Sequence, residues 1–371
     1  MDLDFNKEQA MLRKSVAEFL GKECPFDEVR ELEDSEKGYS PGLWKKMAQL
    51  GWMEACFPES YGGYGESFFD IMIIMEEIGR KAYPSPFFAT VVLCGQTILE
   101  GGSEKQKKDL LGKIASGKLI MALAQQEVDA SFEPSDVNMP AELSGDQYIL
   151  NGTKMFVQDA NVADKLIVAA RSSEGVTLFL VDAKDPGINC RKLNTIGKDN
   201  ICRVDFKDVK VSKDDLIGDA GKGVDILEKM SQRAVVAKCA EMVGGAQESL
   251  EMTVSYAKQR EQYGTPIGGF QIMQHYMADM KIAYETCANY LYQVAWMVDE
   301  GNATVLATSA LKAEVSKQYK FITEKGVQIH GGIGTTREFN IGLFYRRAKA
   351  FEYVLGDADY HTEKIAQAAG M

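Results

Sequence analysis

The sequence predicts a multidomain α+β protein in which a helical domain, a β domain and a second helical domain follow one another along the chain. Its 371 residues exceed what one ordinary hydrophobic core accommodates. The period of the apolar residues changes from helical to strand-like near residue 119, and it returns to helical near residue 223. We therefore expect domains at residues 1–118, 119–222 and 223–371.

The first domain is expected to be helical because its apolar residues recur at spacings of three and four. This pattern is clear in FNKEQAMLRKSVAEFLGKE and in LWKKMAQLGWM, and FFDIMIIMEEIGRKA has the composition of a strongly apolar helix. In EGGSEKQKKDLL, a serine followed by charged residues predicts a helix that begins with this serine as its N-cap.

The second domain is expected to consist of short strands separated by Gly, Pro or charged turns. The segment QYILNGTKMFVQDA predicts two strands joined by a hairpin turn at Asn151–Gly152. Further strands are expected at KLIVAARS, GVTLFLVD, CRKLNTIG and VDFKDVKV. A region of roughly a hundred residues with this pattern is large enough for a compact β domain.

The third domain is expected to contain long helices, because three extended segments keep a helical apolar period. They are DILEKMSQRAVVAKCAEMVGGAQESLEMTVSYAKQR, GFQIMQHYMADMKIAYETCANYLYQVAWMVDEG and ATVLATSALKAEVSKQYKFITEKGVQIHG. One small chain cannot cover helices of this length on all sides. Their exposed apolar stripes therefore predict an oligomer.

Composition and charge narrow the classes of function. With 54 acidic and 42 basic residues, the net charge of −12 argues against a non-specific nucleic-acid-binding protein. No apolar run reaches membrane-spanning length, and MDLDFNKEQAMLRK lacks the apolar core of a signal peptide, so we expect no membrane association. Seven scattered cysteines without a CxxC pair indicate free thiols and a cytoplasmic protein. Three histidines without Cys/His clustering predict no metal site.

The segment KQREQYGTPIGGFQ places Arg260, Tyr263 and Gln271 around a turn between two long helices. An arginine suits a pyrophosphate because its guanidinium is permanently charged and bidentate, although a solvated helix end explains it equally well. Glycines in the later segment HGGIG either let the backbone approach a ligand or cap a helix. We interpret His330 in this segment as a structural histidine at a helix end rather than a general base.

Taken together, KQREQYGTPIGGFQ, VQIHGGIG and YRRAKA, which follow a β region containing NGTKMF, resemble the acyl-CoA dehydrogenase flavoprotein family. The segments ESYGGYG and GSEKQKKDLLGKIASG extend the resemblance over essentially the whole chain. The resemblance implies an N-terminal helical domain, a β-barrel-like middle domain and a C-terminal four-helix bundle, assembled as a homotetramer. It also implies FAD as cofactor, an acyl-CoA substrate and an electron-transferring flavoprotein as electron acceptor.

The same resemblance implies which residues of the helical domain bind FAD. Arg260 and Tyr263 are expected to hold the pyrophosphate and adenosine side of the cofactor, with Gln271 nearby. Gln328 and Gly332 are expected to reach the FAD bound to a neighbouring subunit.

In the β domain, Gln125 and Gln126 are expected to face the pyrimidine edge of the flavin, Ser135 the pyrophosphate, and Phe156 with Gln158 the ring. The sequence departs from the family here. Phe156 stands where the family usually has tryptophan and Gln158 where it has threonine, and VDASFEP replaces the short PGAG turn.

The usual catalytic glutamate of the family is replaced by Leu355 in RRAKAFEYVLG, so this chain is expected to be an atypical member. The backbone N–H of Leu355 can still polarise a thioester carbonyl. The family's alternative position for the base falls on Ala234, and that of the substrate-binding arginine on Val235. Arg233 remains a candidate substrate contact, although it lies two residues from Val235 and about 200° around the helix.

Two carboxylates are candidates for a relocated base. Glu241 lies seven residues after Ala234 on the same helix face, with Lys238 between them as a candidate substrate contact. The alternative for these two is an exposed or interface Lys–Glu pair. Asp357 follows Leu355 in the turn, where the alternative is an N-cap of the final helix.

The leading hypothesis is FAD-dependent oxidation of a short, branched or cyclic acyl-CoA to the enoyl-CoA, with hydride transfer to flavin N5 and a 1,4-type desaturation of a ring as a variant. Phe87 and Phe88 would fill the end of the acyl pocket, with plain core packing as the alternative. Two other functions stay open. One is a redox-neutral acyl-CoA lyase or desulfinase on the same fold, and the other is one subunit of a heteromeric acyl-CoA dehydrogenase.

Overall fold

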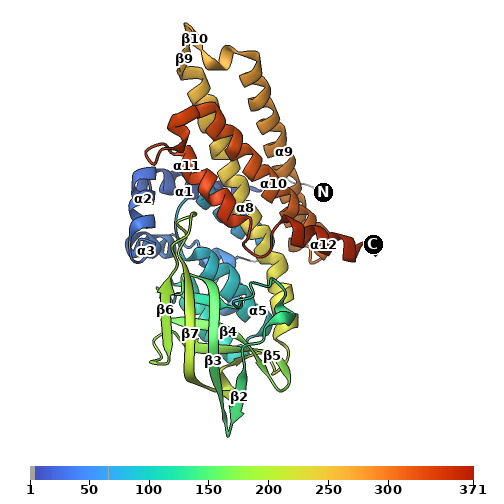
Figure 1. Cartoon of the computed structure of the whole chain (residues 1–371). Coiled ribbons are helices and arrows are strands. Elements are labelled where there is room, and N and C mark those ends of the chain that lie inside the picture. The colour runs from blue at the N-terminus through green and yellow to red at the C-terminus, as the bar shows by residue number, and fades with distance from the viewer. Residues whose placement is uncertain (1–4, 66) are drawn as a thin grey trace.

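The structure is a computed structural model that describes residues 5–65 and 67–371 (Figure 1). Its first part is helical, and the predicted N-cap at Ser103 is confirmed. Ser103 Oγ accepts the N–H of Gln106 at 3.3 Å, and Gln106 Oε1 accepts the N–H of Ser103 at 2.9 Å. Such a reciprocal pair satisfies two backbone donors at the helix start. The α-helices are α1 (Lys7–Glu23), α2 (Phe26–Asp34), α3 (Pro41–Gln49), α4 (Phe68–Arg80), α5 (Gln96–Gly101), α6 (Glu104–Gln106) and α7 (Gly112–Ala115), with the π-helical segments η3 (Phe88–Gly95) and η4 (Lys107–Leu111).

The β domain consists of two four-stranded sheets, with strand orders β1-β4-β5-β8 and β2-β3-β7-β6. All neighbouring strands run antiparallel except β1 and β4, which are parallel. Apolar side chains from both sheets form one core, in which the rings of Tyr148 and Phe179 meet edge to face at 5.1 Å. The strands are β1 (Met121–Ala124), β2 (Ala141–Ser144), β3 (Gln147–Gln158), β4 (Lys165–Ser172), β5 (Gly175–Asp182), β6 (Ile188–Lys192), β7 (Ile201–Ser212) and β8 (Leu216–Ile217).

The hairpin turn predicted at Asn151–Gly152 is wrong, because β3 runs through these residues without interruption. Gly152 has φ of 147° and lies at a register shift between β3 and β7. Asn151 bridges this irregularity, since its Oδ1 accepts the N–H of Asp208 at 2.8 Å. An Asn-Gly pair signals an unusual backbone conformation, and a β-bulge uses it as readily as a turn does. The hairpin turn lies earlier, where Ser144 pairs with Gln147.

The strand predicted at CRKLNTIG is only partly present, since β6 ends at Lys192. The residues that follow form a loop in which the N–H of Leu193 donates to the carbonyl of Ile201 at 2.8 Å. This loop leads toward the C-terminal helices, so that the β domain and the last domain meet there.

Five helices make up the C-terminal part, and a two-stranded ribbon connects the first two at the tip of the molecule (Figure 1). Exposed apolar side chains remain on α9, where Ile272 is 53% and Ile282 is 65% exposed. Among the helices that the structure describes, none is both long and apolar enough to cross a membrane. The elements are α8 (Gly223–Gln259), β9 (Glu261–Gln262), β10 (Thr265–Pro266), α9 (Gln271–Asp299), α10 (Val305–His330), α11 (Ile341–Phe351) and α12 (Ala358–Ala368).

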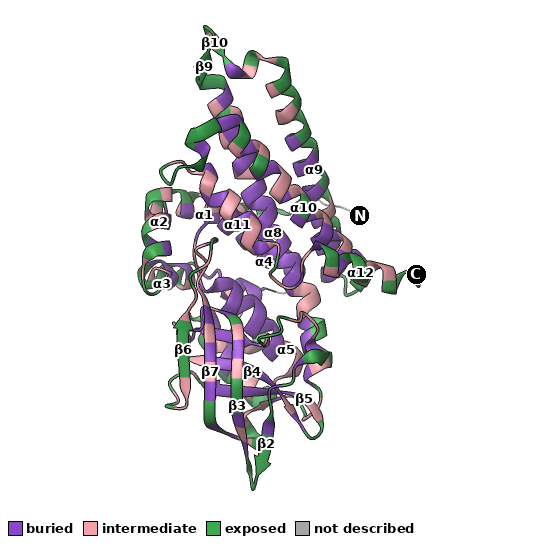
Figure 2. Ribbon diagram, in the orientation of Figure 1, coloured by how far each residue is buried: buried purple, intermediate pink, exposed green. Residues whose placement is uncertain are grey.

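Helices α4 and α8 cross at two glycines, and both helices are largely buried (Figure 2). A Cβ atom on Gly244 would lie 1.9 Å from the carbonyl oxygen of Glu76, and one on Gly79 would lie 1.9 Å from that of Glu241. The two backbones therefore approach too closely for any side chain at these positions. This contact fixes α8 against the N-terminal domain.

We predict that Gly244→Ala destabilises the protein by about 1–3 kcal/mol or more, because the new methyl group meets backbone that cannot move aside. The matched control is Gly21→Ala in α1, where an added Cβ meets no atom within 4 Å. That variant should gain about 0.5–1 kcal/mol from helix propensity. The thermal unfolding midpoints of the two variants should shift in opposite directions from that of the wild type. Equal midpoints for the two variants would contradict the close crossing of α4 and α8.

Candidate active site

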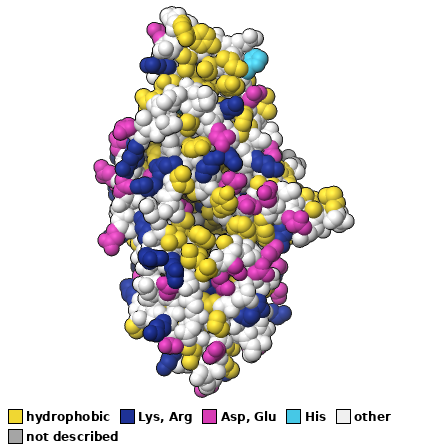
Figure 3. All heavy atoms as spheres, viewed as in Figure 1, with side chains coloured by type: hydrophobic (Ala, Val, Ile, Leu, Met, Phe, Trp, Pro, Cys, Tyr) yellow, Lys and Arg dark blue, Asp and Glu magenta, His cyan; other side chains and the backbone are white. Residues whose placement is uncertain are grey.

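A cavity of about 820 Å³ lies between the β domain and the C-terminal helices. Figure 3 shows a hollow near the middle of the molecule, bordered by hydrophobic side chains. Its walls come from the segment after β1, the end of β3, the loop before β7, the first turns of α8, the start of α10, and the region from the end of α11 into α12. Leu93 of η3 adds a contact from the first domain, so the site is assembled mainly from the second and third domains with one residue from the first.

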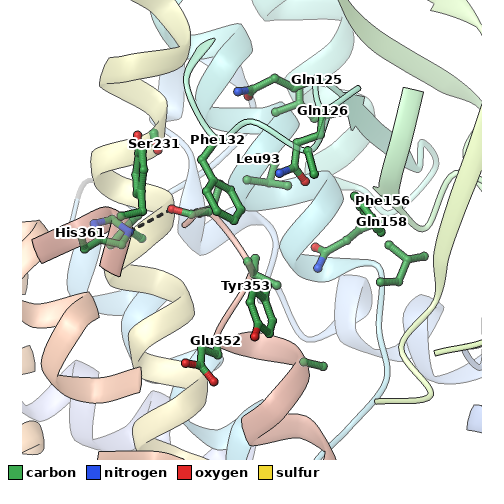
Figure 4. A pocket seen from close by; sticks show the side chains of 18 of the residues that line it. Leu93, Gln125, Gln126, Phe132, Phe156, Gln158, Ser231, Glu352, Tyr353 and His361 are labelled. Atoms are coloured by element: carbon green, nitrogen blue, oxygen red, sulfur yellow. Dashed lines mark hydrogen bonds between the residues drawn. The ribbon is translucent and has the colours of Figure 1, made fainter. Parts of the chain in front are cut away.

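Four of the residues expected to contact a flavin line the β side of this cavity: Gln125, Gln126, Phe156 and Gln158 (Figure 4). A register shift in β3 between Lys154 and Val157 gives Phe156 a φ of 55°, and its side chain is 42% exposed. A bulge of this kind turns a side chain out of the strand's alternation. It therefore explains how Phe156 reaches the cavity.

A buried lysine connects β3 to the segment that carries Gln125. The ammonium of Lys154, which is 0% exposed, donates to the carbonyl of Gln125 at 3.0 Å and to Glu127 Oε1 at 2.7 Å. Burial lowers the pKa of Lys154 to about 8, and Glu127 opposes this shift. Glu127 also accepts the N–H of Met139 at 2.8 Å. This network holds the loop at one wall of the cavity.

The face of α8 that lines the cavity carries Glu228, Ser231, Gln232 and Val235, at helical spacings of three, one and three. Arg233 points away from it, since its Nη1 donates to Gln96 Oε1 at 2.9 Å on α5. The structure therefore places the predicted substrate contact Arg233 outside the residues that line the cavity.

The turn between α11 and α12 brings Leu355 to the cavity. His361, the fourth residue of α12, also lines it, and its Nε2 lies 3.0 Å from the carbonyl oxygen of Leu355 (Figure 4). Its Nδ1 lies 3.1 Å from Ser309 Oγ. With Nε2 as donor and Nδ1 as acceptor, the neutral imidazole satisfies both contacts. Burial and the nearby Lys312 ammonium lower the pKa of His361 to about 4.

A second cavity of about 60 Å³ lies beyond Gln158, which lines both cavities. Here Lys238 Nζ lies 2.5 Å from Glu241 Oε2, and the ammonium sits 3.9 Å from the ring centroid of Phe88. The sequence left open an i,i+3 pair of Lys238 and Glu241 as the alternative to a catalytic role. This pair is present, but both side chains are buried rather than exposed. Glu241, Lys238 and Phe88 are thus brought together, away from the residues that line the larger cavity.

Other predicted residues lie outside the larger cavity. Asp357 caps α12, because its Oδ1 accepts the N–H of Tyr360 at 2.8 Å. Ser135 lies beside the cavity wall, and its carbonyl accepts a hydrogen bond from Arg171 Nη2 at 2.5 Å. Phe87 lines the second cavity together with Phe88.

The remaining cofactor residues lie toward the far end of the C-terminal domain, and none of them lines the cavity. Arg260 ends α8, Tyr263 in the β9–β10 ribbon is 96% exposed, and Gln271 begins α9. The other two, Gln328 and Gly332, lie at the end of α10 and just after it. The chain alone therefore leaves the expected FAD residues in two separate groups.

His330, at the end of α10, is held by its own domain. Its Nδ1 lies 2.7 Å from the carbonyl oxygen of Gly326, and its ring stacks on Tyr256 at 4.3 Å. These contacts support the structural interpretation of His330. Among residues 5–65 and 67–371, no group of three or more His, Cys, Asp or Glu side chains is placed to hold a metal ion.

The residues of this site that sequence reasoning missed include Lys154, Leu93 and His361. Lys154 carried a signal, because counting by twos from Tyr148 along β3 assigns it to the inward face. Leu93, in the π-helical segment η3, lines the larger cavity but has only an apolar neighbourhood in the sequence. His361 carried none, because its partners Leu355 and Ser309 are identified only by the fold.

We predict that Lys154→Met destabilises the protein by about 3 kcal/mol, because Glu127 loses its buried partner and the carbonyl of Gln125 loses its donor. Lys184→Met is the control, since that side chain is 80% exposed and lies 3.8 Å from its nearest acidic partner. Its effect should stay within about 0.5 kcal/mol. Urea unfolding followed by fluorescence would measure both, and similar losses would contradict the structural role of Lys154.

A second prediction concerns acid stability. The pKa of His361 is lower in the folded chain than in the unfolded one, so acidification from pH 6.5 toward pH 4 adds protons mainly to the unfolded state. This difference should cost up to about 3 kcal/mol of stability across that range. His361→Gln keeps a donor and an acceptor but does not titrate. Its stability should therefore fall less than that of the wild type, and parallel pH curves would contradict the assignment.

Comparisons with known proteins cover all three parts of the chain. The N-terminal, middle and C-terminal domains of acyl-CoA dehydrogenases match residues 6–118, 122–209 and 221–370. The chain is 33% identical over 379 residues to the mitochondrial isovaleryl-CoA dehydrogenase of Pongo abelii, covering 98% of this chain and 89% of that protein. It is 29% identical over 361 residues to the caffeyl-CoA reductase-Etf complex subunit CarC of Acetobacterium woodii, covering 94% of each.

Among solved structures, the ChsE4-ChsE5 complex from Mycobacterium tuberculosis contains a chain that superposes with a TM-score of 0.92 at 26% identity. The superposition covers 100% of this chain and 99% of that one. The order of the domains, the cavity between the second and third, and these matches lead to one conclusion: the chain belongs to the acyl-CoA dehydrogenase family, whose members are FAD flavoproteins.

Proposed function

We propose that this protein is a FAD-dependent dehydrogenase of a short, branched or cyclic acyl-CoA. The observation that carries the proposal is the large cavity, whose lining includes both the amides of the β domain and Leu355. The N–H of Leu355, as donor to the thioester carbonyl, and the β-domain residues, as a wall for the flavin, would thus belong to one site. Electrons would pass to an electron-transferring flavoprotein, and the free cysteines are consistent with a cytoplasmic protein.

The residues of the β wall fit a flavin. The side-chain amides of Gln125, Gln126 and Gln158 supply donors and acceptors, and Phe156 supplies an exposed aromatic face (Figure 4). FAD, when bound, supplies the oxidising chemistry by accepting a hydride equivalent from the substrate. The protein's own tasks are to bind and orient the thioester and to exclude water from it.

Leu93, Leu123 and Val235 give the cavity an apolar lining that suits an acyl group. Each of these side chains is less than a tenth exposed, so the lining has little room to move. A short or branched acyl group would remove this apolar surface from water without leaving a void. This supports the proposed substrate class.

No carboxylate occupies position 355, so the base must come from elsewhere. Glu241 and Asp357 stay as predictions, although neither lines the larger cavity. Four carboxylates do line it: Glu133, Asp199, Glu228 and Glu352. Glu133 lies 2.5 Å from Lys364, and Asp199 accepts a hydrogen bond from Thr195. Glu352 is the nearest of the four in sequence to Leu355, which makes it a useful third variant.

We further infer that the working protein is a homo-oligomer, as in the homotetramers of the family. The two groups of expected FAD residues are separated within one chain, and Tyr263 with its neighbours is exposed at the tip. A second copy that brings its tip to the first copy's cavity would unite them. The exposed Ile272 and Ile282 of α9 offer apolar surface for such an assembly.

A second candidate function is that of one subunit in a heteromeric acyl-CoA dehydrogenase. The observation that favours it is the absence of a carboxylate at Leu355 and of an arginine at Val235, while Arg260 and the tip residues are retained. A partner chain would then provide the base, and this chain would provide the tip. The similarity to a chain of the ChsE4-ChsE5 complex is compatible with such a heteromer.

The test is an anaerobic titration of the full chain carrying FAD with short, branched and cyclic acyl-CoAs. We predict loss of the oxidised flavin absorbance with at least one of them. Among Glu241→Gln, Asp357→Asn and Glu352→Gln, the variant that removes the base should slow this loss by about 100-fold or more. Glu142→Gln on an exposed strand is the control and should react like the wild type.

Bound FAD that no acyl-CoA bleaches, across a panel that includes sulfinated and dicarboxylic thioesters, would contradict the dehydrogenase. Formation of a cleaved product would then identify a redox-neutral lyase. Bleaching that appears only after a second family member is added would identify the heteromer.

A further inference from the structure

The turn from Glu352 to Gly356 has a strained backbone. Leu355 has φ of 60°, in the left-handed region that a residue with a branched side chain rarely adopts, and Gly356 follows with φ of 105°. A non-glycine residue in this region is energetically unfavourable, so surrounding contacts must impose it. A Cβ on Gly356 would lie 2.3 Å from the ring of Tyr360, which keeps this position a glycine.

Lys312 is the first of these contacts. It lies on α10, is 0% exposed, and donates through Nζ to the carbonyls of Glu352 at 2.9 Å and Gly356 at 2.8 Å, and to Ser316 Oγ at 3.1 Å. The carbonyl of Phe351 is a fourth, longer contact at 3.4 Å, so the three donors of the ammonium can serve the three shorter ones. A buried lysine without a carboxylate within hydrogen-bonding distance is uncommon, and here Glu352 and Asp357 favour its charge only from farther away.

His361 is the second contact. The carbonyl of Leu355 lies between the two that Lys312 binds, and it accepts the Nε2–H of His361 at 3.0 Å. Ser309 fixes the other side of the ring through Nδ1 at 3.1 Å. Burial lowers the pKa of Lys312 to about 8. That charge in turn helps to keep His361 neutral, so the ring retains the tautomer this contact needs.

Lys312 and His361 hold carbonyl groups of the turn and do not engage the N–H of Leu355. The N–H groups of Tyr353 and Val354 donate to the carbonyls of Ala350 and Phe351. Within residues 5–65 and 67–371, the N–H of Leu355 has no such backbone acceptor. Leu355 lines the cavity, so a ligand there is the acceptor that this N–H could meet.

We propose that Lys312 and His361 are positioning residues, which lock the turn so that the N–H of Leu355 is presented to the carbonyl oxygen of a bound thioester. The proposal rests on the proposed function, because it assumes an acyl thioester in the cavity. Its physical basis is preorganisation: a donor held in place before the reaction stabilises developing charge without reordering. Both residues act through Leu355 and touch no reacting atom.

The test compares two ligands in the full chain carrying FAD: an acyl-CoA thioester, and the matching CoA thioether, which lacks the carbonyl. In the wild type, the thioester should bind about tenfold more tightly than the thioether because of the added hydrogen bond. His361→Leu and Lys312→Met should reduce this ratio toward one and slow flavin reduction at saturating thioester by about 10- to 100-fold. The affinity of the thioether should stay constant.

His361→Gln is the matched variant, because its amide can donate to the carbonyl of Leu355, and it should restore most of the ratio. Should Lys312→Met fail to fold, His361→Leu with its Gln counterpart carries the test. The positioning role alone would be overturned if the variants lost equal affinity for the thioester and the thioether. It would also be overturned if the variants kept the wild-type affinity ratio while the wild type reduces its flavin. A wild type that discriminates the ligands without flavin reduction would contradict only the dehydrogenase. A wild type that binds neither ligand would overturn both.

Discussion

The close crossing of α4 and α8 is the constraint on which the rest of the structure depends. Gly79 and Gly244 bring the two helix backbones into contact, so the middle of α8 is surrounded by protein. Because α8 is a single helix of 37 residues, fixing its middle also fixes both ends. One end lines the cavity with Ser231 and Val235, and the other presents Arg260 at the tip. This wall of the cavity and the exposed tip of the molecule are thus placed by one packing contact.

The walls of the cavity are irregular, and buried lysines stabilise them. A loop or turn exposes carbonyl groups that no ladder of backbone hydrogen bonds satisfies, and each must find a donor when it is buried. Lys154 supplies that donor to the segment after β1, and Lys312 supplies it to the turn before α12. Lys154 also pairs with Glu127, and Lys238 pairs with Glu241 between aromatic rings. Lys154 and Lys312 therefore have in common that they bind backbone carbonyls, which fixes the geometry of the cavity walls.

Regular apolar patterns allowed much of this fold to be predicted from the sequence. Side-chain contacts between residues far apart in the chain could not be predicted in this way. The strands at residues 165–172 and 175–182 appear where their apolar runs indicated. Asn151–Gly152 misled because a β-bulge and a hairpin turn place the same demand on the backbone. The motifs located the loops that line the site, and Leu355 was visible as a substitution. Lys312 was not, because lysine is mostly exposed and its acceptors lie about forty residues away in the chain.

The two halves of the expected chemistry are built to different degrees in this chain. For the proposed donor, the N–H of Leu355, the turn is held by Lys312 and His361. For the proposed base Glu241, the carboxylate is engaged with Lys238, a contact that it would have to break in order to take a proton. Polarising the thioester carbonyl acidifies the neighbouring carbon whichever group receives the proton. Under the proposed function, the turn would therefore serve the reaction equally well with a base from this chain or from a partner, which is compatible with leucine at position 355.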